Sequence, residues 1–280
     1  MNLEWTKRQR LLQFGLAWSV ALVTVAVCVA PTRVGADARA YWMAWRLGLY
    51  GTQTVFGGPA AFLYSPAFAA AVWPLTVLPW LVFQATWYCF SAAAWLWLLW
   101  PVRLPLRIPL LAAAAAVSLT GNIEWLCAVA LVLAARHPSA WVVLILTKVS
   151  LGIGVAWYVF RGEWRQLAVV VGLTASIVLA TWFLPWTAWF RFLLADPGGG
   201  YVLGMSIPIV LRGLVALPLV GWGARSGRPW VLPIAAVIVS PNVWLGTFAL
   251  LAAGVRLAES RTALVAAQRG ALTRSAADSR

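Results

Sequence analysis

The chain has 280 residues, of which 63% are hydrophobic and only 10% are charged. Soluble domains carry about 25% charged residues, so this composition excludes an ordinary soluble domain and indicates a membrane protein. The formal net charge is +14, but the basic residues lie in short segments between apolar runs rather than in one patch. That distribution is typical of the positive-inside rule and argues against nucleic-acid binding.

Long apolar runs recur along the chain. A helix that crosses a bilayer needs about 20 apolar residues, and its backbone groups must bond internally. The runs lack the even alternation of a membrane barrel. We therefore predict an all-α, polytopic helical membrane protein of about eight to ten spans. The predicted single membrane domain covers 1–255, and 256–280 is expected to form a basic cytoplasmic tail. The apolar runs are 11–30, 63–82, 83–100, 108–120, 125–135, 140–160, 167–184, 206–222 and 231–255.

The N-terminal segment sets the predicted orientation. Lys7, Arg8 and Arg10 precede the first run, which places the N-terminus in the cytoplasm. The first run is long and has no clear small-residue cleavage site, so an uncleaved first span is favoured over a signal peptide. Residues 31–62 then form an outer-face loop. Helical spacing over 35–51 predicts an interfacial helix, with tryptophans at headgroup level.

Breaks in the later apolar runs complicate a simple count of spans. Segments 161–165 and 224–228 are arginine-rich and predicted to be cytoplasmic, whereas 102–107 would fall outside if 63–100 formed two spans. The run at 140–160 has Lys148 at its centre, which predicts two half-length segments that meet there. The final run is predicted to turn at 240–242. Broken helices are tolerated where they line a cavity or pack within protein.

Ionisable residues inside or beside apolar runs are the candidate functional groups, because they are costly at membrane depth. Asp37 is an outer-face carboxylate on the same helical stripe as Tyr41; it either caps a helix or acts as a base. Three alternatives are open for Lys148: it binds an anion, with phosphate favoured, it snorkels towards an interface, or it pairs with Glu124. Glu124 is either the partner of a cation or catalytic. Arg212 either snorkels or provides a second phosphate ligand.

Soluble-enzyme motifs are absent from the sequence. No phosphate-binding glycine loop with its lysine, GxSxG, HExxH or DxD pattern occurs. Cys28, Cys89 and Cys127 lie in apolar runs with no pair spacing, so no disulfide or zinc motif is predicted. Carboxylates on the outer face are too scarce for a multi-ligand calcium or magnesium cage. We predict neither a metal nor a cofactor.

Several short motifs occur in the order found in one family of membrane enzymes. In that order the chain resembles the GT-C superfamily of integral membrane glycosyltransferases. It is more closely similar to glycosyltransferase family 87, the polyprenyl-phosphate-mannose-dependent mannosyltransferase-like proteins. Asn122 stands where that family tends to have glutamine, and the proline usual near the lysine is absent after Lys148. The motifs are Asp37 with "AYWMA" (40–44), "GLYG" (48–51), "FLYSPAFAAAVWPLTVLP" (62–79), "GNIEWL" (121–126), "TKVSLGI" (147–153), "GMSIPIVLR" (204–212) and "SPNVW" (240–244).

The resemblance implies a multi-pass glycosyltransferase of a bacterial plasma membrane. It would transfer a hexose, with mannose favoured, from a polyprenyl-phosphate donor to a lipid or glycan acceptor at the outer face, with inversion and without a metal. Asp37 would be the general base, and Lys148 and Arg212 would bind the donor phosphate. The substrate pocket would be lined by Tyr41, Trp42, Tyr64, Asn122, Glu124 and Ser206.

Two other function classes stay open at the level of sequence. A transporter or lipid flippase would also use broken helices and intramembrane charges, and it should show two related halves. A non-catalytic membrane scaffold would need neither Asp37 nor Lys148.

Overall fold

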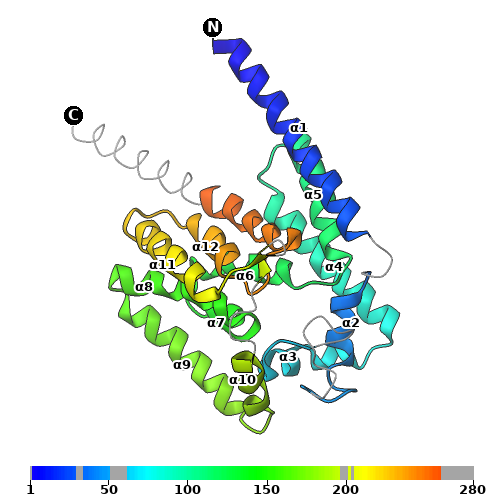
Figure 1. Cartoon of the computed structure of the whole chain (residues 1–280), viewed down its shortest axis with the longest axis vertical. Coiled ribbons are helices and arrows are strands. Elements are labelled where there is room, and N and C mark those ends of the chain that lie inside the picture. Colours follow the sequence, from blue (N-terminus) through cyan, green and yellow to red (C-terminus); the bar gives the residue numbers. More distant parts are fainter. Residues whose placement is uncertain (1, 30–33, 51–61, 196–200, 203–204, 260–280) are drawn as a thin grey trace, which may run out of the picture.

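The computed structural model describes residues 2–29, 34–50, 62–195, 201–202 and 205–259 (Figure 1). Within these ranges the fold is helical apart from one antiparallel pair of two-residue strands, which confirms the predicted all-α class. Among the described residues, three helices are long and apolar enough to cross a membrane, at Lys7–Cys28, Trp80–Leu99 and Ile209–Ser226.

The elements follow one another along the chain with few long connections. They are α1 (Asn2–Cys28), α2 (Ala36–Met43), α3 (Pro66–Thr76), α4 (Trp80–Leu99), α5 (Leu104–Ser118), α6 (Glu124–Ala134), α7 (Ala140–Thr147), the 3-10 helix η2 (Val149–Val155), α8 (Ala156–Arg161), α9 (Trp164–Ala180), α10 (Trp186–Ala195), β1 (Tyr201–Val202), β2 (Met205–Ser206), α11 (Ile209–Arg225), α12 (Val231–Val239) and the 3-10 helix η3 (Leu245–Leu251). Residues 252–259 are also helical, so Arg256 belongs to that helix, and 260–280 of the predicted tail lie outside the described residues.

The length of helix α3 bears on whether 63–100 forms two membrane spans. Ser65 caps α3 by accepting the N–H of Phe68, and the helix has 11 residues. At 1.5 Å per residue it is about 16 Å long, too short for a hydrocarbon core of about 30 Å. Among the described helices between 63 and 100, only α4 is therefore long and apolar enough to cross a membrane. The condition under which 102–107 would fall outside, two spans over 63–100, is not met by these helix lengths.

The basic segments gather at one end of the molecule. Arg161 donates to the carbonyl of Ala224 (3.2 Å), and the Tyr158 hydroxyl donates to that of Ala134 (3.0 Å). At the same end the Nε of Arg256 donates to the carbonyl of Trp97 (2.8 Å). We call this the arginine-rich end. Helices α2 and α3 lie away from it, as Figure 1 shows.

The run at 140–160 folds back on itself at Lys148, as predicted. Helix α7 ends at Thr147, and Lys148 is extended (φ −131°, ψ 92°) before η2 begins. Gly154 lies so close to Trp141 that a Cβ would be 2.1 Å from the indole ring. This contact between the start of α7 and the end of η2 makes the segment an antiparallel hairpin with Lys148 at its tip.

A second hairpin has the same construction. Helix α12 ends at Val239, and an extended stretch from Ser240 precedes η3. Gly254 then lies against the carbonyl of Trp230, so this segment also returns to where it began. The predicted turn at 240–242 is confirmed. The two breaks also share a sequence pattern, "KVSLG" at 148–152 and "NVWLG" at 242–246.

The helix predicted over 35–51 is shorter than its spacing suggested. Helix α2 ends at Met43, because the chain tightens into turns in which the N–H of Ala44 bonds to the carbonyl of Tyr41. Gly48 and Tyr50 then adopt positive φ values of 78° and 59°. Left-handed residues cannot continue a right-handed helix.

Replacement of Gly121 by alanine tests the junction between α2 and the α5–α6 loop. Gly121 has φ 81°, and an added Cβ would lie 2.3 Å from the Cβ of Ala38. We expect Gly121→Ala to lower the free energy of unfolding by more than the roughly 1–2 kcal/mol that left-handed backbone costs an alanine. Thermal melting in detergent measures the loss.

Gly48→Ala is the matched control, because Gly48 has a similar φ of 78° but no neighbour within 4 Å of its added Cβ. Equal stability of the two variants would contradict the close packing of Gly121 on Ala38.

Candidate functional site

Asp37 lies in the first turn of α2, close to the loop that joins α5 and α6. The N-cap of α2 is Gly35, and no side chain caps the helix, so the capping role that the sequence left open for Asp37 is not seen. The N–H of Gly35 donates to the carbonyl of Leu119 (2.7 Å), and that of Asp37 donates to the carbonyl of Thr120 (2.8 Å). These backbone bonds hold the start of α2, and with it Asp37, against the α5–α6 loop.

The Asp37 carboxyl is half-buried and interacts with three nearby polar groups. Burial raises its pKa above the usual value, because the charged form loses hydration. A hydrogen bond to the Thr120 side chain and the charge of Lys148 act in the opposite direction, and the charge of Glu124 raises the pKa further. A carboxylate with a raised pKa is a better proton acceptor than a solvated one.

Two tyrosines form the next layer of the site. The hydroxyls of Tyr41 and Tyr64 are 3.2 Å apart, and their rings meet edge to face at 5.4 Å. Tyr41 is buried against Phe68 and Trp87, which fixes both phenols. The side of α2 that carries Asp37 and Tyr41 thus faces a rigid aromatic wall with hydroxyl groups at its edge.

The ion pair between Lys148 and Glu124 forms the base of the site. Lys148 Nζ lies 2.5 Å from Glu124 Oε1, with the lysine side chain 14% exposed and the glutamate 1% exposed. Of the alternatives left open for Lys148, the pairing with Glu124 is therefore the one observed. An ammonium group has three N–H donors, so this contact leaves donors for a further acceptor.

Two buried oxygen atoms in the site have no hydrogen-bond partner among the described residues. They are Asn122 Oδ1 and Glu124 Oε2. Buried polar atoms are normally satisfied by protein or water. We interpret these two acceptors as positions for water or for hydroxyl groups of a ligand.

Sequence reasoning missed three residues that build the site. Thr120 bonds to Asp37, and Ser65 donates to the carbonyl of Leu146 (2.5 Å), which ties the start of α3 to the residues before Lys148. Cys127, predicted to be a buried hydrophobe, lies 3.8 Å from the hydroxyl of Thr147. The sequence could have indicated Thr120, which precedes "GN", and Ser65, which follows Tyr64, since hydroxyl side chains often bond to nearby backbone.

Trp42 is positioned apart from the Asp37 carboxyl by its own contacts. Its Nε1 donates to the carbonyl of Leu78 (2.8 Å), and its ring packs on Trp80. Arg46 stacks over the same indole at 3.7 Å. These contacts join α2 to the α3–α4 connection, and among the described residues no hydrogen bond joins Trp42 to the Asp37 site.

Arg212 and Ser206 are not joined to Lys148 by any described contact. Arg212 is buried in α11 and donates to the carbonyls of Ile238 (3.3 Å), Ser240 and Pro241 (3.2 Å) at the tip of the second hairpin. Its observed contacts are thus with helix-end carbonyls, which favour a cation. Ser206 belongs to β2, and its side chain lies outside what the structure describes.

Comparisons with known proteins found no match. No protein-family model, no curated protein and no solved structure matches the chain. The described residues also contain no group of three or more histidine, cysteine, aspartate or glutamate side chains that could hold a metal ion.

Replacement of Asp37 by asparagine tests the burial of this carboxylate through its pH dependence. Because the folded-state pKa is raised, the folded protein favours the protonated carboxyl, and ionisation at neutral pH lowers its stability. We expect Asp37→Asn to melt at a higher temperature than the native chain at neutral pH. The difference in melting temperature between this variant and the native chain should narrow as the pH falls through the raised pKa of Asp37 towards the usual aspartate value.

Glu259→Gln is the control for this titration, because the Glu259 side chain is 52% exposed. Its melting temperature should follow that of the native chain at every pH. A destabilised Asp37→Asn variant at neutral pH would contradict the account of Asp37.

The energy of the Glu124–Lys148 pair can be measured with a double-mutant cycle. Glu124→Gln leaves a buried ammonium unpaired, and Lys148→Met leaves a buried carboxylate unpaired; loss of one partner costs about 3–5 kcal/mol. The double variant buries neither charge. We therefore expect its loss in free energy of unfolding to be smaller than the sum of the losses of the two single variants. Purely additive losses in thermal or denaturant unfolding would mean that the two side chains are not coupled.

Proposed function

We propose that the chain is a membrane glycosyltransferase that moves a hexose, with mannose favoured, from a polyprenyl-phosphate donor to a lipid or glycan acceptor. The observation that carries the proposal is the placement of the half-buried Asp37 carboxyl beside the Glu124–Lys148 pair. A base and a cation in one site are the two groups that such a transfer requires.

The proposed setting is a bacterial plasma membrane that a GT-C-like, polytopic domain crosses several times. Three helices have the length and composition for it. The arginine-rich end would face the cytoplasm, and the end with Asp37 would face outward, by the positive-inside rule. A polyprenyl donor has its chain in the bilayer and its phosphate at the interface, so it would meet Asp37 there.

The proposed reaction is a single displacement. An acceptor hydroxyl attacks the anomeric carbon while Asp37 takes the hydroxyl proton. The bond between the anomeric carbon and the phosphate oxygen breaks, and its electron pair leaves with the polyprenyl phosphate. Configuration inverts, and no oxidant, metal or cofactor takes part. The raised pKa of Asp37 favours this proton transfer.

Lys148 would stabilise the charge that develops on the leaving phosphate. Glu124 holds the ammonium by one contact, and the remaining N–H groups would bind phosphate oxygens. Glu124 would then act as the positioning residue for Lys148. The free acceptors on Asn122 and Glu124 would bind hydroxyl groups of the sugar.

Transfer of labelled sugar tests this proposal. Membranes that contain the native chain are incubated with radiolabelled polyprenyl-phosphate mannose and a native lipid extract, and labelled products are separated. We expect Asp37→Asn to lower the rate by about 10²–10⁴, the usual contribution of a general base. Lys148→Met should also lower the rate, whereas the matched Glu259→Gln control should retain it.

Two results would contradict the proposal. Undiminished transfer by Asp37→Asn would remove the base assignment. No transfer by the native chain from any polyprenyl-phosphate sugar, with the protein folded in the membrane, would remove the enzyme assignment.

A transporter or lipid flippase is the second candidate, and the two broken hairpins favour it. Transport sites commonly lie where helices are interrupted, and the breaks at 148 and 240–244 share the order of elements described above. Uptake or lipid scrambling by the chain in vesicles, abolished by Lys148→Met but retained by Asp37→Asn, would support this candidate over sugar transfer. A non-catalytic scaffold would show neither sugar transfer nor transport, in the native chain or in either variant.

A further inference from the structure

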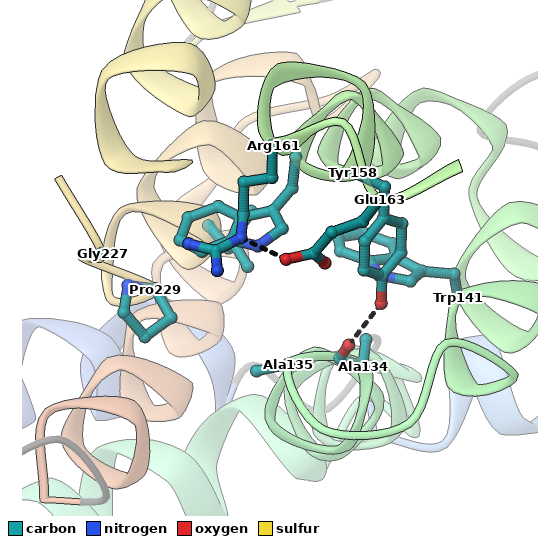
Figure 2. Close-up of a pocket in the computed structure, with 10 residues that line it drawn as sticks. Ala134, Ala135, Trp141, Tyr158, Arg161, Glu163, Gly227 and Pro229 are labelled. Atoms are coloured by element: carbon teal, nitrogen blue, oxygen red, sulfur yellow. Dashed lines mark hydrogen bonds and ion pairs between the residues drawn. The ribbon is translucent and has the colours of Figure 1, made fainter. Parts of the chain in front are cut away.

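A cavity with an arginine and a glutamate in its lining lies at the arginine-rich end, at the opposite end of α6 from Glu124. Its volume is about 240 Å³. Figure 2 shows Arg161 and Glu163 on one side of the opening and Gly227 and Pro229 on another. The cavity is lined by Ala134, Ala135, Trp141, Trp157, Tyr158, Arg161, Glu163, Gly227, Pro229 and Leu232.

The backbone places the two charged side chains at the mouth of this cavity. Helix α8 ends at Arg161, and Gly162 adopts a left-handed conformation (φ 66°). The N–H of Glu163 then returns to the carbonyl of Tyr158 (2.9 Å). This helix-ending turn brings the carboxylate of Glu163 to 2.5 Å from the guanidinium of Arg161.

Solvent reaches both members of this ion pair. The Arg161 side chain is 40% exposed and that of Glu163 is 32% exposed. Exposed pairs contribute only about 0–1 kcal/mol to stability, so folding alone gives little reason for Glu163. The chain has seven acidic residues against 21 basic ones, and one of them is held beside this cavity.

The residues around the cavity are of the kinds found at the headgroup level of a membrane. Trp164, next to Glu163, is 61% exposed, and Trp222 is 46% exposed beneath the guanidinium of Arg228. Exposed tryptophans and arginines at a helix end are typical of the membrane interface. The rings of Trp141 and Trp157 form apolar walls inside the cavity, and Tyr158 has its hydroxyl bonded to Ala134.

We propose that this cavity binds a phosphoethanolamine headgroup of a membrane lipid. The phosphate would bind to Arg161 and the primary ammonium to Glu163, so that the zwitterion matches both charges of the pair. An anionic headgroup would satisfy Arg161 but bring a like charge towards Glu163. A choline headgroup has no N–H to donate to the carboxylate. The cavity lies at the end of the molecule opposite Asp37, and lipid binding there does not depend on sugar transfer.

Lipid retention by the purified full-length chain tests the proposal. The protein in detergent is incubated with equimolar dioleoyl phosphatidylethanolamine, phosphatidylcholine and phosphatidylglycerol, and bound lipids are counted by native mass spectrometry. We expect phosphatidylethanolamine to be retained over each of the others by about tenfold, the ratio that one charge-assisted hydrogen bond provides.

Substitutions at the pair identify which charge selects which part of the lipid. Glu163→Gln should remove the preference for phosphatidylethanolamine and leave total lipid binding in place. Arg161→Lys keeps the charge but loses the planar fork, and it should weaken retention of all three lipids several-fold. Arg165→Lys, at an exposed neighbour outside the cavity lining, and Glu259→Gln are the charge-matched controls and should bind as the native chain does.

Three outcomes would overturn the proposal. They are tighter retention of phosphatidylglycerol by the native chain, equal retention of choline and ethanolamine lipids, and an unchanged order of preference in Glu163→Gln. Melting temperatures recorded beside the binding data separate a loss of the site from a loss of the fold.

Discussion

The contact between Lys148 and Glu124 is the interaction on which the rest of this fold depends. Charges inside an apolar protein or bilayer are costly unless they are paired. The pair forms only because α7 ends at Thr147 and α6 begins at Glu124, which places both side chains at the same level. The hairpin at 140–161 therefore follows from the lysine as much as from the apolar residues around it.

The two ends of the molecule have opposite chemical character. Helix α6 begins at the buried pair and ends at the cavity beside Arg161 and Glu163. With 11 residues it separates the two sites by about 16 Å. At one end the charges are buried and few, and the site suits a reaction at a carboxylate. At the other they are exposed and mostly positive, and the surface suits lipid headgroups.

Sequence patterns predicted the broad class of fold and several local features. Helical spacing and hydropathy predicted an all-α chain, and polar residues within apolar runs predicted breaks at Lys148 and at 240–242. Both breaks are observed, because a helix with a buried charge or a Ser-Pro-Asn turn gains partners by unwinding. Hydropathy could not show that α3 is too short to cross, since α3 ends at Thr76 and α4 begins after Pro79 without a polar gap between them.

The candidate site was only partly predictable for a similar reason. Asp37, Tyr41, Tyr64, Glu124 and Lys148 are rare polar groups in apolar surroundings, and the structure brings these five into one cluster of interacting groups. The bond from Ser65 to Leu146 joins residues 81 positions apart, which no local pattern specifies. Arg212, like Lys148, was predicted from the sequence to bind the donor phosphate. Its long side chain instead bonds to the carbonyls at the tip of the other hairpin.

Asp37 lies within the electric field of the Glu124–Lys148 pair, and its titration reports that field. Difference infrared spectroscopy of the Asp37 carboxyl, assigned with Asp37→Asn, measures its titration directly in the native chain and in two variants. We expect a titration midpoint above the usual aspartate value, which rises further in Lys148→Met and falls in Glu124→Gln. The same midpoint in all three proteins would contradict it, because the carboxyl would then be independent of both charges.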